Sequence, residues 1–532
     1  MILEVNIKGV IKVAREFEPV LGISYKWIAA IIVMIGTFMT LLDTTIVDIT
    51  IPKMLAALNT DTYGIQWVII AYMIGSAVAM TVVGWLGAAT SYRFVYMLGM
   101  VVFLTMSVIC GQATSLTEML IGRLIQGIGE GLIVPISMTI LFLVFPKEEA
   151  GLAMGIYGLG ASFAPALGPT IGGFLTEHLS WRWIFYVNVP IGIMGFLLAL
   201  MLLEDVKPED EKPWPFDWVG FILLAIFLGS LITFITKGQD KGWLQSSFII
   251  TLIAICVVSL IAFLIWEHYQ RYPVLDLSLF KDPIFTIGVV TLGIFSLTLY
   301  GIFYLMPLYM ERLRMYPTLL SGLIMLPGSI AMGIALIIGG ALSDRIGVRP
   351  IAIICMIFFV IFSYLLGIFD LYTPKSIVLI MFVLWCIPAG PLFPTLTTGS
   401  LQNVEDSKVN MGSSIQNVTR LVCGSIGTAI ATTILERRAS YFFDMLSAHT
   451  NYGHIPFLLA WKKAIRGFMA KGSCLPFAKE QANAFMYFYI KAHAYFIAYQ
   501  ASFKILAVLA LIGLPILFFF KVEKGAKKHI AI

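Results

Sequence analysis

The residue with the clearest chemical potential in this 532-residue chain is Asp43, which lies well inside a long apolar stretch at residues 27–50. An ionised side chain costs several kcal/mol in hydrocarbon unless it is paired or faces a water-filled cavity. Burial also favours the neutral carboxyl group, so an acid here can take up and release a proton. The sequence therefore predicts that Asp43 carries a proton or anchors a group beside the carrier, the alternative being a purely structural aspartate. Asp48 stands about 140° further around the helix, and we expect it to be solvated near the outer end.

A second group of polar residues lies within the apolar stretch 119–144. Arg123, Gln126, Gly127 and Glu130 follow one another at i, i+3, i+4 and i+7, the spacing that places side chains on one face of a helix. We expect this face to line a cavity. Arg123 and Glu130 are two turns apart, about 10 Å along the axis, so a direct bridge would need bent side chains or water. Glu130 is consistent equally with a proton-binding or cation-binding role and with such a buried pair.

Arg420 is the only basic residue deep within the apolar stretches of the second half, and Asn417 precedes it by about one helical turn. We expect these residues to order a cavity or to pair with an acid across it. Aromatic side chains could offer a lipophilic compound stacking surfaces and attract a cation, although aromatic residues in such stretches more often pack or face lipid. The candidates are Tyr72, Tyr157, Tyr300, Phe303 and Tyr304.

Other chemistries find little support in the sequence. His449 and His454 have no third ligand at a spacing suited to a metal, so we expect surface histidines and no metal site. No phosphate-binding glycine loop ending in GKS or GKT occurs, which leaves ATP-driven work without support. No catalytic constellation is evident either, and the sequence predicts neither an enzyme nor a bound cofactor.

Membrane-spanning helices must position these residues. The composition is 59% hydrophobic and only 12% charged, far from that of soluble domains. Apolar runs of 18 or more residues recur along the chain, and each is long enough to cross about 30 Å of hydrocarbon as a helix. The sequence predicts an all-α integral membrane protein with fourteen spans. They fall near residues 27–50, 65–89, 93–112, 119–144, 151–175, 184–203, 219–236, 247–267, 284–309, 318–340, 350–369, 376–399, 411–435 and 500–520.

The distribution of basic residues predicts the orientation in the membrane. With the N-terminus inside, the cytoplasmic segments collect 17 Lys and Arg and the short outer loops hold seven. This asymmetry follows the positive-inside rule, so we expect both termini to be cytoplasmic and the net charge of +5 to reflect topology, not nucleic-acid binding. The leader 1–26 lacks the order of a signal peptide, and we expect it to remain attached. The tail 521–532 is expected to lie in the cytoplasm.

A short internal sequence repeat divides the chain into two halves. The sequence "GWLGAATSYRF" begins at Gly84 and "GALSDRIGVRP" begins at Gly340, and both read G-x-L followed by an Arg. This repeat predicts two six-helix bundles, an arrangement typical of alternating-access transporters. The predicted domains are a bundle at 27–204, two inserted helices at 205–283 and a second bundle at 284–520 that includes a long outer segment, 436–499.

The stretch "GASFAPALGPTIGGFL" is rich in glycine and proline although it lies within a span. Small residues let a neighbouring helix approach closely, and proline introduces a bend. The motif G-P-x-x-G-G, formed by Gly168, Pro169, Gly172 and Gly173 after Pro165, resembles the antiporter motif of the major facilitator superfamily, and within it that of the fourteen-helix drug:proton antiporters of the EmrB/QacA type. The resemblance implies that this bent helix packs the two bundles together on one side of the membrane.

Further stretches carry the same resemblance over most of residues 27–520. "LLDTTIVDITIP" is similar to the family's helix 1 motif, "RLIQGIGEG" to its helix 4 motif, "WRWIFYVNVPIG" to the signature that enters helix 6, and "SIQNVTRLVCGSIGTAI" to helix 13. The resemblance implies that Arg123 contacts the first helix and helps to set the protonation of acidic neighbours.

The first copy of the G-x-L repeat departs from the family pattern. Ala88, Ala89 and Ser91 occupy the positions of an acid, an arginine and a glycine in the family's cytoplasmic gate motif. The second copy is intact, so we place the gate charge network on the second half. Its residues are Gly340, Asp344, Arg345, Gly347 and Arg349.

The sequence and the resemblance together predict a proton-driven exporter of lipophilic toxic compounds in the inner (cytoplasmic) membrane. A dedicated exporter of one solute, such as a siderophore, fatty acid or lipid, is the alternative, and a membrane-embedded sensor or enzyme is a third reading. The segment 436–499 resembles the long loop of EmrB-type members that work with a periplasmic adaptor and an outer-membrane channel, which predicts adaptor docking. Self-packing on the transporter is the alternative for this segment.

Overall fold

The computed structural model describes residues 24–60, 62–146, 149–205, 215–370, 372–405, 408–448 and 455–520. The predicted leader before residue 24, the tail 521–532, His449 and His454 lie outside these residues, as does the side chain of Asp48. The described part of the chain is helical throughout and contains no strand, which confirms the all-α prediction. Thirteen of its helices are long and apolar enough to cross a membrane, and the remaining predicted span, 151–175, falls within a helix of 29 residues.

The helices correspond closely to the predicted spans. In chain order they are α2 (Tyr25–Ala57), α3 (Thr62–Ala89), α4 (Tyr92–Gln112), α5 (Leu116–Val144), α6 (Ala150–His178), α7 (Trp183–Tyr186), α8 (Asn188–Leu202), α9 (Trp218–Gly238), α10 (Ser247–Tyr269), α11 (Pro283–Leu308), α12 (Thr318–Ile346), α13 (Val348–Leu366), α14 (Lys375–Leu401), α15 (Val409–Ser447), α16 (Ile455–Ala470) and α17 (Leu475–Leu517). Three short helical turns, η3 (Trp243–Gln245), η4 (Leu277–Lys281) and η5 (Tyr309–Leu313), lie between them. The predicted sixth span, 184–203, is divided into α7 and α8.

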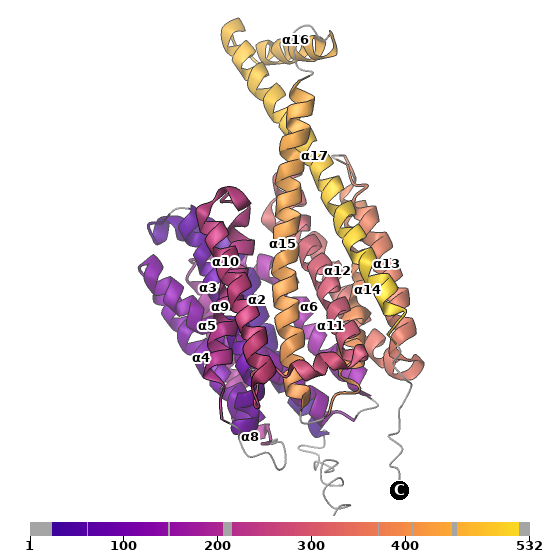
Figure 1. Cartoon of the computed structure of the whole chain (residues 1–532). Coiled ribbons are helices and arrows are strands. Elements are labelled where there is room, and N and C mark those ends of the chain that lie inside the picture. Colours follow the sequence, from indigo (N-terminus) through magenta and orange to yellow (C-terminus); the bar gives the residue numbers. More distant parts are fainter. Residues whose placement is uncertain are drawn as a thin grey trace, which may run out of the picture.

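The spanning helices stand side by side, and the first described helix, α2, begins at the same end of this bundle at which the last one, α17, ends (Figure 1). We call that end the terminal side. Helix α5 packs against α2, α3 and α4, while α14 packs against α11, α12 and α13. Helix α6 lies between α2 and α12, and α15 contacts both α3 and α11. The central helices of the two predicted halves therefore meet through α6 with α12 and through α3 with α15.

Close backbone approach explains how the polar face of α5 is held in place. A Cβ atom at Gly75 of α3 would lie 2.0 Å from the carbonyl oxygen of Leu124, and one at Gly127 of α5 would lie 2.1 Å from that of Tyr72. Only glycine fits at such crossings, which small residues make possible between membrane helices. The contact fixes α3 against the face of α5 that carries Arg123.

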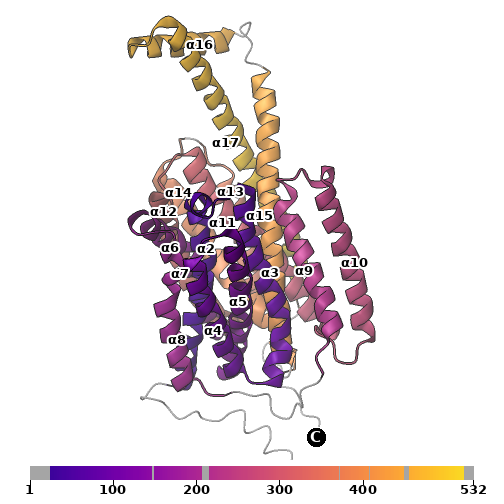
Figure 2. The same cartoon turned by 90° about the vertical axis from the view of Figure 1, so that its left-hand side faces the viewer.

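Two helices extend far beyond the bundle, contrary to the prediction of ordinary spans at 411–435 and 500–520. Helix α15 has 39 residues and α17 has 43, which at about 1.5 Å per residue gives lengths of about 58 and 65 Å. Figure 2 shows both helices rising out of the bundle on the side opposite the chain ends, with α16 lying across their tip. The predicted outer segment 436–499 thus continues the last two spanning helices as a helical stalk, and neither Gly nor Pro interrupts the chain at 428–448 or at 477–512.

The stalk packs partly against itself. Tyr495 of α17 donates a hydrogen bond to Glu436 of α15 (2.9 Å), and the rings of Phe443 and Tyr487 meet at 5.5 Å. Helix α16 covers the start of α17 with a small apolar cluster around Ile465. These contacts within the segment join the stalk helices α15, α16 and α17 to one another.

Candidate functional site

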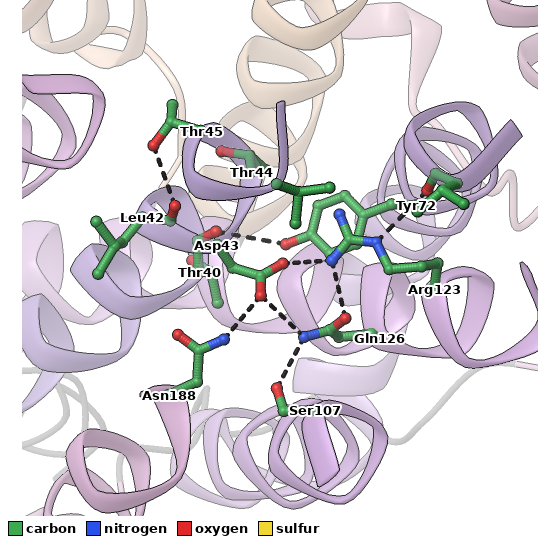
Figure 3. Close-up of polar contacts among 12 residues, drawn as sticks. Thr40, Leu42, Asp43, Thr44, Thr45, Tyr72, Ser107, Arg123, Gln126 and Asn188 are labelled. Carbon is green, nitrogen blue, oxygen red and sulfur yellow. Dashed lines mark hydrogen bonds and ion pairs between the residues drawn. The ribbon is translucent and has the colours of Figure 1, made fainter. Parts of the chain in front are cut away.

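Asp43 lies at the centre of a buried polar cluster formed by helices α2, α4, α5 and α8 of the first half (Figure 3). Its side chain on α2 is fully buried. One carboxylate oxygen accepts a hydrogen bond from Nη1 of Arg123 on α5, and the other accepts from Nδ2 of Asn188 on α8 (2.7 Å) and from Nε2 of Gln126 (3.2 Å). All three neighbours donate to the carboxylate, and Arg123 also brings the opposite charge to it.

Arg123 is held by contacts on every side. Its Nε donates to the carbonyl oxygen of Val68 (3.4 Å), and its Nη1 also donates to Oε1 of Gln126 (2.9 Å). The guanidinium carbon lies 4.0 Å from the centre of the Tyr72 ring, at a distance typical of cation–π contact. The predicted contact between Arg123 and the first spanning helix is therefore present in the structure, as an ion pair with Asp43.

Two members of this cluster escaped prediction from the sequence. Asn188 is the first residue of α8, directly after the short α7, and Ser107 on α4 accepts a hydrogen bond from Nε2 of Gln126 (2.8 Å). Asn188 could have been predicted, because it stands in the family-like stretch "WRWIFYVNVPIG". Ser107 could not, because a lone serine in an apolar helix does not indicate a site. Oδ1 of Asn188 is buried and has no hydrogen-bond partner among the described residues, so it offers an acceptor for water or a proton donor beside Asp43.

Glu130 occupies a different environment two turns along α5. It is buried, its polar neighbours are the hydroxyl groups of Tyr72 and Ser76, and it forms no ion pair within the part of the chain that the structure describes. The direct bridge to Arg123, which the spacing already made difficult, does not form, because Arg123 pairs with Asp43 instead. Glu130 is thus a buried acid without a cationic partner.

A second polar cluster lies where helices of the two halves meet. The guanidinium carbon of Arg420 on α15 lies 5.4 Å from the ring centre of Phe393 on α14, and that ring stacks on Tyr157 of α6 with centres 6.0 Å apart. Tyr157 and Tyr300 are polar neighbours of Arg420, and Glu130 of α5 lies within electrostatic range of it from across the interface. Acid and base from opposite halves therefore face the same region.

The remaining predicted cavity residues lie in different environments. Asn417 donates through Nδ2 to the carbonyl oxygen of Ser413 (2.9 Å) and to the sulfur of Met138 on α5 (3.4 Å), so it spans the two halves. Phe303 packs edge-on against Trp385 (5.4 Å) inside the second half, and Tyr304 is exposed. Among the five aromatic candidates, Tyr72, Tyr157 and Tyr300 lie beside an ionisable group of these clusters.

The glycines of the G-P-x-x-G-G motif face the first half. A Cβ atom at Gly168 would lie 2.2 Å from Thr45 of α2, and one at Gly172 would lie 2.8 Å from Ile46, while one at Gly173 would meet nothing. The side chains of Pro165 and Pro169 lie outside the described residues. Helix α6 meets the second half through glycines earlier in its sequence, because Gly155 and Gly158 lie against Leu336 of α12.

The intact gate motif forms a contact between the two halves at the terminal side. The carboxylate of Asp344, near the end of α12, accepts the backbone N–H groups of Gly151 (2.9 Å) and Leu152 (3.1 Å) in the first turn of α6. A Cβ atom at Gly340 would lie 2.0 Å from the carbonyl oxygen of Gly151, so the two helices touch through their backbones. The acid interacts with the free N–H groups and positive end of a helix, in place of the predicted charge pairs.

The other gate residues have separate roles. Arg349 donates to the carbonyl oxygen of Phe518 at the end of α17 (2.7 Å), and Arg345 is exposed. Gly347 joins α12 to α13 with a φ of 111°, a left-handed conformation that favours glycine. Of the predicted network, Gly340 and Asp344 make the contact between the halves.

Comparison with known proteins identifies the fold and the family. The model of the Major Facilitator Superfamily matches residues 33–428. The chain belongs to this superfamily. It is a multi-pass membrane transporter, not an enzyme. Its structure resembles that of the human organic anion transporter MFSD10, with a TM-score of 0.59 and 14% sequence identity over 92% of this chain and 99% of the other.

Related superfamily members include proteins named for multidrug export and for fatty acid resistance. The multidrug export protein EmrB of Escherichia coli is 29% identical over 80% of this chain and 83% of its own, and the fatty acid resistance protein FarB of Neisseria gonorrhoeae is 27% identical over 82% and 85%. The MFS-type transporter YhcA of Bacillus subtilis is 30% identical over 87% and 86%. The protein is an efflux transporter related to EmrB-type multidrug exporters.

Proposed function

We propose that this transporter exchanges protons for lipophilic toxic compounds and expels them through a central cavity. The observation that carries the proposal is the fully buried Asp43–Arg123 pair, with Glu130 as a second buried acid on the same helix as Arg123. Ionisable groups are costly within a membrane and mark proton and substrate pathways in transporters. Both groups are carboxylic acids that can bind and release a proton, so we take the proton gradient as the source of energy.

Protonation of Asp43 supplies the coupling. The neutral acid no longer balances Arg123, and an uncompensated charge left by breaking a buried pair costs about 3–5 kcal/mol. The protonated and ionised proteins therefore favour different positions of α2 and α5, which contribute Asp43 and Arg123. Protons from outside neutralise the acid, substrate from inside promotes their release, and the two halves alternate around the cavity.

The cluster between the halves is suited to amphipathic organic molecules. Tyr157 and Phe393 offer aromatic surfaces, and Glu130 and Arg420 offer one charge of each sign. A lipophilic cation would lie near Glu130, and a lipophilic carboxylate would lie near Arg420. The buried Arg420 favours a second candidate function, a dedicated exporter of one anionic solute such as a fatty acid. The related FarB is named as a fatty acid resistance protein, which supports this alternative.

A transport assay in proteoliposomes tests the proposal. Addition of a lipophilic cationic dye is expected to cause release of protons, and a pH gradient is expected to drive dye movement that stops when a proton ionophore is added. A panel of cationic, neutral and anionic compounds separates a multidrug exporter from a dedicated one. Dye movement that is unaffected by the ionophore would contradict proton coupling.

We place the terminal side in the cytoplasm and the stalk outside the inner membrane, following the excess of basic residues at the terminal side. The stalk then projects into the periplasm. Its exposed apolar side chains include Ile455, Leu459, Phe485, Phe488 and Tyr489. We propose that they dock a membrane-fusion adaptor that leads to an outer-membrane channel, because such a surface is unfavourable in water.

Shortening the stalk tests adaptor docking. Deletion of residues 445–490, with a short Gly/Ser linker between α15 and α17, is expected to abolish resistance in cells and adaptor pull-down. Proton-driven dye uptake into vesicles is expected to remain, because the Asp43 cluster lies in the bundle. Phe488→Glu is a milder variant that should also reduce adaptor capture. Undiminished resistance and pull-down in the deletion variant would refute a docking role.

A further inference from the structure

The terminal side of the first half lacks the acid that its counterpart uses. In the second half, Asp344 of α12 binds the start of α6. The equivalent last turn of α3 has Ala88 in the acidic position, and it faces the start of α15, where Gly84 lies against Met411. Helix α15 begins after Lys408 and has no side-chain cap, and a lysine at the positive end of a helix is unfavourable.

In the structure, an acid from the segment that follows the two inserted helices, α9 and α10, lies at the start of α15. Asp276 lies in the connection between α10 and α11, and its Oδ2 accepts from Nζ of Lys408 (2.7 Å). Its backbone N–H also contacts the sulfur of Met411 (2.9 Å). Burial alone would raise the pKa of the Asp276 carboxyl, but hydrogen bonds from Lys408 and Ser278 outweigh this effect and hold the pKa below its usual value. The acid is therefore ionised at the start of α15.

The inserted pair is attached to both halves of the transporter. Phe216, just before α9, packs against Trp85 of α3 with ring centres 4.7 Å apart. At the end of α10, beside the start of α9, Glu267 accepts the backbone N–H of Leu275 (2.7 Å), one residue before Asp276. One apolar cluster joins side chains of α3, α9, α10 and α15 along the way. A continuous series of contacts thus runs from α3 through the inserted pair to α15.

A cavity of about 500 Å³ marks the place of the missing acid. Gly84, Ala88 and Tyr92 line it from the first half, and Asp276 and Lys408 line it from the other side. An acidic side chain at position 88 would extend into the space that these residues share.

We propose that the connection 270–282 is a strap that holds α15 to the first half at the terminal side, with Asp276 replacing the acid absent from the last turn of α3. The inserted helices then stabilise the state in which the terminal side is closed. The inference rests on the alternating access proposed above, since a strap matters only if the halves move apart. It gives the inserted pair a role in the transport cycle.

A cysteine that reports opening of the terminal side tests the strap. Ser343 is buried on α12 beside Gly151 of α6, so Ser343→Cys reacts with a membrane-impermeant maleimide only when the halves separate. The variant is studied in nanodiscs with the exposed Cys474 replaced by serine, and the parent without Ser343→Cys gives the background. Gly340→Ala is the positive control, because its methyl group would lie 2.0 Å from the Gly151 carbonyl oxygen.

Asp276→Asn is expected to increase the labelling rate about fivefold, the upper range for a partly exposed ion pair. Asparagine preserves the cap on Ser278, so only the charge is lost. Asp282→Asn, in the same connection but capping α11, is the matched control and should leave the rate unchanged. Adding Ala88→Asp to Asp276→Asn should restore slow labelling, and a normal thermal unfolding temperature shows that each variant is folded.

Two results would overturn the strap. One is equal labelling of Asp276→Asn and Asp282→Asn, and the other is fast labelling that Ala88→Asp does not reverse. The assay contains neither substrate nor a proton gradient. Failure of drug–proton exchange would therefore leave these rates unchanged, and the two proposals are tested separately.

Discussion

An Asp43→Asn variant is expected to lose drug-induced proton release completely in proteoliposomes while remaining folded. Asparagine has nearly the same shape and still offers one oxygen to Arg123 or Asn188, but it cannot bind a proton or balance the guanidinium charge. Because an uncompensated buried charge costs about 3–5 kcal/mol, the variant should rest in the state that the protonated wild type favours. The measurement is the pH change in the lumen on addition of a cationic dye.

The control for this variant is Asp240→Asn, which removes an exposed carboxylate in the turn after α9. It should release protons as the unmodified protein does. Dye binding to Asp43→Asn, measured by fluorescence anisotropy, should persist, since Asp43 is enclosed by α2, α5 and α8 and lies apart from the aromatic residues of the second cluster. Full coupling in Asp43→Asn would assign the carrier role to Glu130.

Glu130→Gln is expected to reduce export of cationic compounds roughly tenfold, which corresponds to about 1.4 kcal/mol of lost interaction. Glu130 is buried without a cationic partner, so a positively charged substrate can supply the missing charge. Export of a lipophilic carboxylate should be much less affected, because Arg420 remains in place. The ratio of initial export rates for a matched cation and anion measures the effect.

Glu118→Gln on the same helix is the matched control. Glu118 belongs to the capping box at the start of α5, where glutamine is also accepted, so transport should be unchanged. Equal losses for the cation and the anion in Glu130→Gln would contradict a role in cation recognition and would indicate a role in proton coupling.

Several features could be read from the sequence because they depend on local pattern. Apolar runs long enough to cross the membrane predicted the helices, since an unsatisfied backbone is too costly in hydrocarbon for any open structure. The same reasoning selected Asp43 and the polar face of α5, because charges are rare in such runs. The intact gate copy was recognised from its resemblance to the family's motif, and Asp344 does join the two halves.

The choice of partners was decided only by the tertiary structure. Asn188 and Ser107 complete the Asp43 cluster from helices far away in sequence, and Asp276 reaches Lys408 across 132 positions. The length of α15 and α17 also depends on their mutual support beyond the bundle. Periodicity shows which face of a helix is polar, but a side chain's partner depends on which helices are adjacent and on where glycines let them touch. That information belongs to the packing of the whole chain.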